Sequence, residues 1–379
     1  MFNIHFSHCG LSLLAPTCYT FPFMHSFTLL IKPASGDCNL RCGYCFYLAK
    51  SALFGAAPHR MSVATLEALT RAYFACGLPS YTFAWQGGEP ALMGLDFYRE
   101  AVRLQKKFLP AGATCANAFQ TNGTLLTDAW AQFFRDENFL VGISIDGPQP
   151  LHDLRRCHAS GAGSHADVLR GLACLQRRNV DYNVLTLVSA SNVGQPLDVY
   201  RYVRELGATY HQYIECVEFD AAGEPQPFAL QPGQWGDFLC ALFDEWFAQD
   251  TRRVSVRLFD SILSRLATGV PTLCSMSGNC CNYFVVETQG DVFPCDFHVT
   301  PAHRLGHVSD GFAALAASPL YEAFGRGKDP RSATCSACRF LPLCMADCPK
   351  NRNASGRFLC ADWKRFYTHT IERFEQLLT

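Results

Sequence analysis

Apolar residues between residue 27 and about residue 250 follow two alternating periods. Short runs rich in β-branched and aromatic residues, typical of strands, alternate with stretches in which apolar residues recur every three or four positions, as on one face of a helix. The predicted strands span residues 27–31, 81–85, 116–120, 140–145, 182–188 and 210–217. The predicted helices between them span residues 63–76, 96–108, 128–136, 166–178 and 195–205.

This alternation predicts right-handed crossover units, a parallel sheet and therefore an α/β fold. Six such units fit a partial (β/α)6 barrel better than an open doubly wound sheet, although the period alone does not separate the two. Helical periods continue over residues 231–249 and 257–267 and end at Gly269-Val270-Pro271. We therefore expect an extension of unclear role at 1–23, a barrel at 24–250, a helical linker at 251–271 and a small domain with a C-terminal helix at 272–379.

The composition changes beyond residue 271, where nine of the chain's twenty cysteines lie around a predicted hairpin at residues 283–287 and 291–294. The first 24 residues contain no Lys or Arg, so a basic secretory signal is not expected. Cysteines in such a chain indicate metal binding in a reducing compartment, the cytoplasm, rather than disulfides. A net charge of −1, with no basic run and no apolar run near ~18 residues, argues against nucleic-acid and membrane partners.

Three cysteines, Cys38, Cys42 and Cys45, follow the first predicted strand in the spacing C-x3-C-x2-C. A cubane iron–sulfur cluster normally takes four cysteines, so three would leave one iron open to another ligand. A fragment of a structural zinc site is the alternative, but it needs a fourth Cys or His, and none lies between Cys45 and His59. The spacing therefore favours a reactive cluster.

Polar motifs follow the next three predicted strands, where a barrel gathers its functional residues. They are Gln86-Gly87-Gly88-Glu89-Pro90, Gln120-Thr121-Asn122-Gly123 and Ser144-Ile145-Asp146-Gly147-Pro148. With the cysteine motif, Cys295-Asp296 and residues 344–352, they resemble the anaerobic sulfatase-maturating enzymes of the radical S-adenosylmethionine (SAM) superfamily over nearly the whole chain from Met24. The resemblance implies a radical SAM barrel followed by a SPASM-type iron–sulfur domain, and oxidation of a Cys or Ser in a sulfatase to Cα-formylglycine.

The resemblance also implies a cofactor site. SAM would chelate the open iron of the Cys38, Cys42 and Cys45 cluster, and its amino group would meet the glycine-rich turn, in which glycines allow close approach and a carboxylate accepts from an ammonium. The residues implied for SAM are Gly87, Gly88, Glu89, Ser144, Asp146 and Arg156, with Arg155 beside the last. Tyr47 and Gln86 match positions near the peptide substrate.

Two further [4Fe-4S] clusters are implied in the second domain, which makes three in all. By resemblance the ligands interleave, with Cys274, Cys280, Cys295 and Cys348 in one set and Cys335, Cys338, Cys344 and Cys360 in the other. Spacing alone also permits zinc, a sequential site from Cys335 to Cys348, or Cys281 in place of Cys280. Ala346-Asp347 stands where the family has Gly-Gly, a departure that bears on the backbone of this loop.

Asp296 directly follows a predicted cluster ligand. Oxidation of a β-carbon to an aldehyde removes a hydrogen atom, a proton and an electron. The 5′-deoxyadenosyl radical would take the first, Asp296 the proton as general base, and the adjacent cluster the electron. The expected partners are an unfolded sulfatase polypeptide as substrate and reduced flavodoxin or ferredoxin as electron donor.

Two other functions stay open from the sequence. One is a SPASM peptide maturase that makes thioether or carbon–carbon crosslinks, although such enzymes often carry an N-terminal peptide-binding domain and only about 25 residues precede the first strand here. The other is a non-catalytic iron–sulfur electron carrier or a zinc-stapled binding module. The sequence does not indicate whether the target residue is Ser or Cys.

Overall fold

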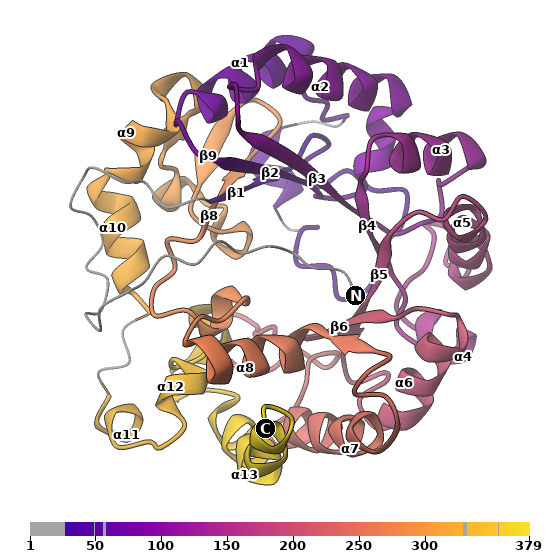
Figure 1. Cartoon of the computed structure of the whole chain (residues 1–379), viewed down its shortest axis with the longest axis vertical. Coiled ribbons are helices and arrows are strands. Elements are labelled where there is room, and N and C mark those ends of the chain that lie inside the picture. The colour runs from indigo at the N-terminus through magenta and orange to yellow at the C-terminus, as the bar shows by residue number, and fades with distance from the viewer. Residues whose placement is uncertain (1–26, 49, 56–57, 329–331, 355) are drawn as a thin grey trace.

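The computed structural model describes residues 27–48, 50–55, 58–328, 332–354 and 356–379, so the predicted extension at 1–23 lies outside the described residues. Ten strands form one curved sheet in the order β10-β9-β8-β1-β2-β3-β4-β5-β6-β7. Helices surround the sheet on its outer side and form a ring in the view of Figure 1. The chain is therefore a partial barrel whose edge strands are β10 and β7.

The six predicted strands and the helices between them are present, with ends within three residues of the predicted ones. Strands β1 to β6 pair in parallel along the chain, which confirms the α/β fold class. The strands are β1 Thr28–Ile31, β2 Ser80–Trp85, β3 Thr114–Thr121, β4 Leu140–Ser144, β5 Tyr182–Val188 and β6 Tyr210–Glu215. The helices are α1 Val63–Phe74, α2 Leu95–Phe108, α3 Asp128–Asp136, α4 Gln149–His152, α5 His165–Arg177, α6 Pro196–Glu205, α7 Gln234–Gln249 and α8 Arg257–Thr268.

The predicted hairpin is also present, but it extends the barrel sheet. Strand β8 (Tyr283–Val286) pairs in parallel with β1 and antiparallel with β9 (Asp291–Phe293). The register sets Ile31 opposite Val286, and the backbone N–H of Lys32 donates to the Val286 carbonyl at 2.8 Å. The sheet therefore runs unbroken from the first motif into the cysteine-rich half, while the domain boundaries at 250 and 271 stay predictions.

Apart from the expected C-terminal helix, which has 17 residues, the remaining elements are short and were missed because they are too brief to show a period. The remaining strands are β7 Ser255–Val256, β10 Gly306–His307, β11 Arg352–Asn353 and β12 Gly356–Arg357. The remaining α-helices are α9 Phe312–Ala316, α10 Pro319–Arg326, α11 Ala333–Ser336, α12 Leu341–Cys344 and α13 Cys360–Gln376. Short 3-10 turns lie at Ser51–Phe54, Pro90–Met93, Cys274–Met276, Asp296–His298, Pro301–His303, Val308–Asp310 and Pro349–Asn351.

Aromatic side chains contribute to two hydrophobic clusters, which together form most of the core. One cluster lies among β1 to β4 and α1 to α3, and the other fills the space between α7, α8 and α13. Trp235 meets Trp363 and Phe243 meets Phe374, with ring centroids 6.3 and 4.7 Å apart, so the C-terminal helix packs on α7. The aromatic side chains of α7, among them Trp235 and Phe243, are therefore core.

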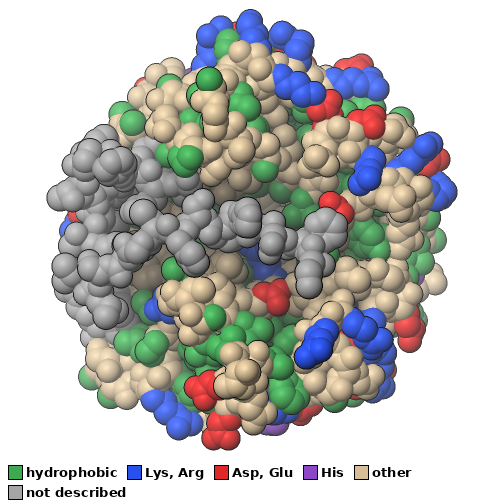
Figure 2. Space-filling view, in the orientation of Figure 1, with side chains coloured by type: hydrophobic (Ala, Val, Ile, Leu, Met, Phe, Trp, Pro, Cys, Tyr) green, Lys and Arg blue, Asp and Glu red, His purple; other side chains and the backbone are tan. Residues whose placement is uncertain are grey.

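Charged side chains lie mainly towards the rim of the face seen in Figure 2, where Lys and Arg gather over α1 and α2. On these helices Arg71 is ion-paired with Glu67, and Arg103 is ion-paired with Glu100. Of the helices in the described ranges, none has the length and apolar character needed to cross a membrane.

A close backbone contact fixes α5 against the loop after β3. A Cβ on Gly171 would lie 2.0 Å from the Gly123 carbonyl oxygen, a backbone atom that cannot rotate away. We expect Gly171→Ala to lower the free energy of unfolding by about 2 kcal/mol, because overpacking outweighs the ~1 kcal/mol that Ala gains over Gly in a helix. The matched control is Gly194→Ala, which faces open space and should change stability by less than about 0.5 kcal/mol in chemical denaturation. Equal stability of the two variants would contradict the contact.

Candidate functional site

The cysteine loop, residues 33–48, follows β1 and carries Cys38, Cys42 and Cys45, all three partly buried. Burial, then the negative charge of Glu89, and then the Cys42 and Cys45 thiols together raise the pKa of the Cys38 thiol to about 12. Burial likewise raises the pKa of Cys42 to about 11. The three predicted ligands are thus close enough to interact electrostatically, and metal binding would have to displace their protons.

The Gly-Gly-Glu turn after β2 docks on the cysteine loop through its backbone. The N–H of Gly88 donates to the Ser35 carbonyl at 2.6 Å, and that of Glu89 to the Asp37 carbonyl at 2.7 Å. A Cβ on Gly88 would lie 1.9 Å from the same Asp37 oxygen, and Gly87 has a φ of +132°. In the structure the glycines admit the backbone of the cysteine loop, and their contact with a ligand stays a prediction.

The donors to the Glu89 carboxylate in the structure are protein groups, whereas the sequence predicted the ammonium group of the cofactor. Its Oε1 accepts from the Ala91 N–H at 2.9 Å and the Thr121 hydroxyl at 2.8 Å, and its Oε2 from the Asn122 N–H at 2.8 Å. It is fully buried, and burial raises its pKa to about 7 despite these donors. Because three protein groups donate to the carboxylate, it braces the loops after β2 and β3, and its predicted contact with SAM stays a prediction. The side-chain amide of Asn122 in turn lies 3.6 Å from the Cys38 sulfur.

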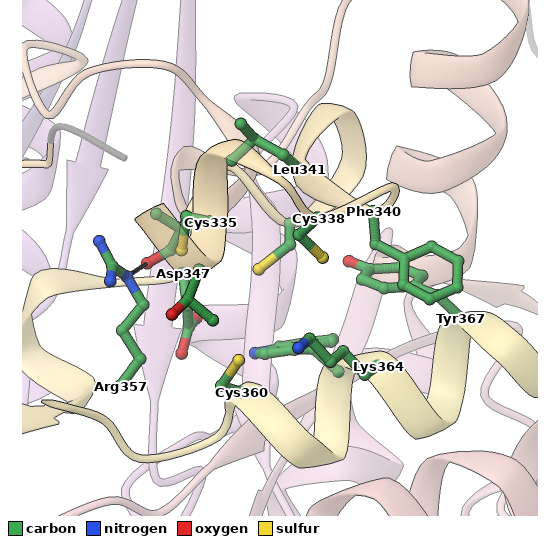
Figure 3. Close-up of a pocket in the computed structure, with 13 residues that line it drawn as sticks. Cys335, Cys338, Phe340, Leu341, Asp347, Arg357, Cys360, Lys364 and Tyr367 are labelled. Carbon is green, nitrogen blue, oxygen red and sulfur yellow. Dashed lines mark hydrogen bonds between the residues drawn. The ribbon is translucent and has the colours of Figure 1, made fainter. Parts of the chain in front are cut away.

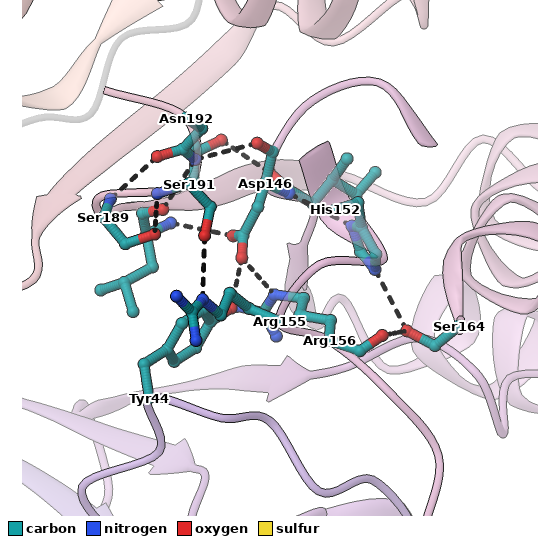
Figure 4. Close-up of polar contacts among 12 residues, drawn as sticks. Tyr44, Asp146, His152, Arg155, Arg156, Ser164, Ser189, Ser191 and Asn192 are labelled. Atoms are coloured by element: carbon teal, nitrogen blue, oxygen red, sulfur yellow. Dashed lines mark hydrogen bonds and ion pairs between the residues drawn. The ribbon is translucent and has the colours of Figure 1, made fainter. Parts of the chain in front are cut away.

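Asp146 and Arg156, predicted as separate contacts of the cofactor, bind each other. Arg156 Nε donates to Asp146 Oδ2 at 2.9 Å, and the hydroxyl of Tyr44 donates to the same oxygen (Figure 4). The guanidinium carbon of Arg156 lies 5.6 Å from the centre of the Tyr44 ring. Tyr44 stands between two of the predicted ligands in sequence, so this buried ion pair supports the cysteine loop. Ser144 is buried at the end of β4.

Polar residues after β5 extend the hydrogen bonds around Asp146, which we call the Asp146 network. These residues were not predicted from the sequence. Asn192 donates from Nδ2 to the Asp146 carbonyl at 3.0 Å, and Ser191 accepts from Arg155 Nε at 2.9 Å (Figure 4). His152 Nδ1 accepts from the Asp146 N–H at 3.3 Å. The signal was available, because a polar stretch directly after a barrel strand is where functional residues gather.

The predicted base, Asp296, begins the 3-10 turn after β9 and lies against the cysteine loop. Its Oδ2 is 3.6 Å from Lys32 Nζ, and its backbone carbonyl accepts from Lys50 Nζ. The rings of Phe46 and Phe297, the residues that follow Cys45 and Asp296, are 4.9 Å apart. The structure therefore brings the predicted base and the three-cysteine motif together.

The two predicted substrate contacts have different environments. Tyr47 is 2% exposed and its hydroxyl donates to Glu287 Oε1, so it does not face an open cavity as expected. Its neighbour in space, Lys32, lies 4.7 Å from the ring centre. Gln86 is partly exposed at the end of β2, and its backbone N–H donates to the Ile31 carbonyl at 2.9 Å.

One set of four cysteines lines a single pocket in the C-terminal part. Figure 3 shows thiols from α11, from the segment before α12 and from the first turn of α13 around it. A fourth thiol, from α12, also lines this pocket. The residues that line this pocket do not include Cys348. The cysteines that line the pocket are Cys335, Cys338, Cys344 and Cys360, a grouping that favours the interleaved assignment over the sequential one, although the ligand sets stay a prediction.

The other predicted set is recognised from the electrostatic neighbours of its thiols. Burial and then Asp347 raise the pKa of the Cys348 thiol, and the Cys295 and Cys274 thiols raise it further. Burial also raises the pKa of Cys280, against the opposing charge of Lys328, with a further increase from Cys274. Cys274 thus interacts electrostatically with each of the other three thiols of this set.

Cys281, the cysteine next to Cys280 in the sequence, contacts a different part of the chain. Its Sγ donates to the Tyr321 carbonyl at 3.4 Å, and its side chain packs on the barrel core. Across the described ranges, no three His, Cys, Asp or Glu side chains are close enough to hold a single metal ion. The fit to clusters therefore depends on the shared pocket, the neighbouring thiols and the donor chemistry.

Comparison with known proteins gives two family matches. Residues 33–203 match the radical SAM superfamily, and residues 274–339 match an iron-sulfur cluster-binding domain. A serine-type anaerobic sulfatase-maturating enzyme of Bacteroides thetaiotaomicron is 36% identical over 92% of this chain and 90% of its own length. A cysteine-type enzyme of Clostridium novyi is also 36% identical, over 92% and 96%.

A solved structure is similar over the same extent. Native anSMEcpe with bound AdoMet and the Cp18Cys peptide superposes with a TM-score of 0.87 at 32% identity, covering 93% of this chain and 99% of that one. The similarity therefore includes the barrel and the cysteine-rich half together.

His152 offers a test of the Asp146 network by pH. The ring is fully buried, and burial lowers its pKa to about 4, whereas an unfolded His titrates near ~6.5. Below that pH the unfolded state binds the extra proton, so the stability contributed by this group is lost as the pH falls from about 6.5 towards 4. Between pH 7 and pH 5 the wild type should lose about 2 kcal/mol through His152.

We expect His152→Gln to escape this loss. The difference in unfolding free energy between wild type and variant, from urea titrations, should therefore shrink by about 2 kcal/mol from pH 7 to pH 5. A difference that stays constant between pH 7 and pH 5 would mean that the His152 ring is not held neutral.

Proposed function

The chain belongs to the family of anaerobic sulfatase-maturating enzymes, and on that premise we propose that it oxidises a Ser or Cys of a sulfatase to Cα-formylglycine. The observation that carries the proposal is the contact between the cysteine loop and the turn that begins with Asp296, through Lys32 and the Phe46–Phe297 ring pair. This contact puts a carboxylate beside the motif that would start the reaction.

The donor sets fit the clusters that this chemistry needs. Cys38, Cys42 and Cys45 would hold a cluster with one open iron, and each set of four thiols would fill the ligand shell of an auxiliary cluster. When bound, these clusters and SAM supply the removal of one hydrogen atom from the β-carbon and of one electron. The carbonyls of the Gly87 and Gly88 turn, Ser144 and the free N–H groups of Arg156 are the proposed contacts of SAM.

Asp296 supplies the remaining step as the proposed general base. Its side chain is 15% exposed, so it can accept the proton of a substrate Oγ or Sγ. Loss of that proton, one hydrogen atom and one electron converts a Ser side chain to the aldehyde. A Cys side chain gives the thioaldehyde, which water hydrolyses with release of sulfide. Gln86 is the proposed substrate contact, and Tyr47 supports the site through Glu287.

Members of this family act on sulfatases, and for this chain we propose an unfolded sulfatase segment as substrate, because the target side chain has to enter the barrel. Reduced flavodoxin or ferredoxin is the proposed electron donor, and the cytoplasm the proposed compartment, in keeping with reduced thiols. Serine-type and cysteine-type relatives are equally identical to the chain, so identity does not select the target residue.

The test is an assay with paired Ser and Cys sulfatase peptides. In the proposed role, Asp296→Asn should keep cleaving SAM to 5′-deoxyadenosine but form aldehyde about 10²-fold more slowly or worse, because the base is lost. Asp291→Asn is the matched control on the same hairpin, where the carboxylate pairs with Arg304, and should match the wild type. Product masses and 5′-deoxyadenosine are measured together.

Each failure has a distinct meaning. Full aldehyde yield from Asp296→Asn removes this residue from the base role. Cleaved SAM with intact peptides in the wild type would indicate another substrate, as for a crosslinking maturase. No 5′-deoxyadenosine at all would indicate a non-catalytic iron–sulfur protein.

Cluster ligation gives an independent prediction on two adjacent cysteines. Three cubanes correspond to about twelve irons per chain. We expect Cys280→Ala to lower the iron content towards about eight, because one auxiliary cluster loses a ligand. Cys281→Ala should keep the wild-type content, since its thiol is directed to the Tyr321 carbonyl. If Cys281→Ala lowers the iron content and Cys280→Ala does not, Cys281 is the ligand in place of Cys280.

A further inference from the structure

We propose that Lys32 is a positioning residue for the proposed base, because its buried ammonium holds the Asp296 carboxylate against the loop that carries the three-cysteine motif. The inference deepens the proposed function and rests on it. Lys32 directly follows β1 and is six residues before Cys38 in the chain. Nothing in its sequence position distinguishes it from a solvated lysine at the end of a strand.

The burial of Lys32 is the first observation. The residue is 2% exposed, and an ammonium removed from water needs opposite charge or hydrogen-bond acceptors nearby. Its Nζ lies 3.6 Å from Asp296 Oδ2 and 4.7 Å from the centre of the Tyr47 ring. The charge of Lys32 also lowers the pKa of the buried Glu287, although burial raises it overall. One ammonium therefore compensates two carboxylates.

The second observation is that different residues contact the backbone and the side chain of the turn that begins at Asp296. Lys50 binds the backbone carbonyl of Asp296, and Phe46 packs on Phe297. In the part of the chain that the structure describes, Lys32 is the cation that pairs with the Asp296 carboxylate. Lys50 and Phe46 can thus hold the turn, while Lys32 sets the direction of the side chain within it.

This arrangement has a kinetic consequence. Without the ammonium, the carboxylate can rotate while the backbone of the turn stays in place. Hydrogen-atom removal at the cysteine loop would continue, but proton transfer to a misplaced base would slow, and a displacement of about 1 Å can cost about 10²-fold. Lys32 should therefore affect the yield of aldehyde per SAM cleaved rather than the rate of cleavage.

The experiment compares Lys32→Gln, Lys32→Arg and the Lys32→Gln/Asp296→Asn pair in the iron-loaded full chain. We expect Lys32→Gln to form at least 10-fold less aldehyde per 5′-deoxyadenosine, with peptide affinity within about 2-fold of wild type. Lys32→Arg keeps the charge and should restore most of the ratio. Because Lys32 acts through Asp296, adding Lys32→Gln to Asp296→Asn should lower the ratio no further.

Controls separate this role from a structural one. Lys106→Gln, at an exposed lysine paired with Glu137, should match the wild type, and iron content and thermal unfolding are measured for every variant. If Lys32→Gln holds less iron, Lys32→Arg carries the test. If Lys32→Arg then holds the wild-type iron content but forms as little aldehyde per 5′-deoxyadenosine as Asp296→Asn does, the inference is overturned.

The remaining outcomes are also decisive. A wild-type ratio in Lys32→Gln, or effects of Lys32→Gln and Asp296→Asn that multiply, overturns the role of Lys32 alone. If the wild type cleaves SAM but forms no aldehyde from either peptide, the proposed function fails, and this inference fails with it.

Discussion

Backbone contact between the loops after β1 and β2 is the constraint on which the site depends. The Asp37 carbonyl accepts from the Glu89 N–H and occupies the space that a side chain on Gly88 would need. Once these loops are docked, Glu89 is sealed from water, and its carboxylate has to be satisfied by protein donors. Those donors come from Thr121 and Asn122, so three consecutive strand ends are fixed relative to one another.

The parallel pairing of β8 with β1 connects this assembly to the cysteine-rich half. Because Ile31 faces Val286, the residues that follow, Lys32 and Glu287, leave the sheet side by side. The chain then turns through β9 and returns over the cysteine loop at Asp296. Breaking a buried ion pair costs about 3–5 kcal/mol, less here because Asp296 is partly exposed, so Lys32 strongly favours one direction of the Asp296 side chain.

The sequence allows the fold and the metal ligands to be predicted far better than the individual polar contacts. Periods of two and 3.6 locate β1 to β6 and their helices, whereas the ligand sets come from the family resemblance, because cysteine spacing alone leaves other sets open. Strands β7 and β10 have two residues each, too few for any period. The Asp146–Arg156 pair and the Glu89 brace were not predictable, because a motif gives the strand end on which a residue lies but not the side chain that meets it there.

The loop between α12 and Cys348 shows how a departure in sequence is tolerated by its surroundings. Met345, Ala346 and Asp347 have φ values of 45°, 63° and 58°, the left-handed conformation that the family's Gly-Gly would adopt readily. Each non-glycine residue there costs about 1–2 kcal/mol.

Hydrogen bonds offset part of this strain. Arg357 Nε donates to the Ala346 carbonyl at 3.2 Å, and Asn351 Nδ2 donates to Asp347 Oδ2 at 3.2 Å. The loop lies between Cys344, which lines one four-thiol pocket, and Cys348, which neighbours the other set. A relaxed loop would move these two thiols relative to each other. The requirement to place one thiol in each ligand set is therefore a physical reason for the left-handed backbone of a loop that contains no glycine.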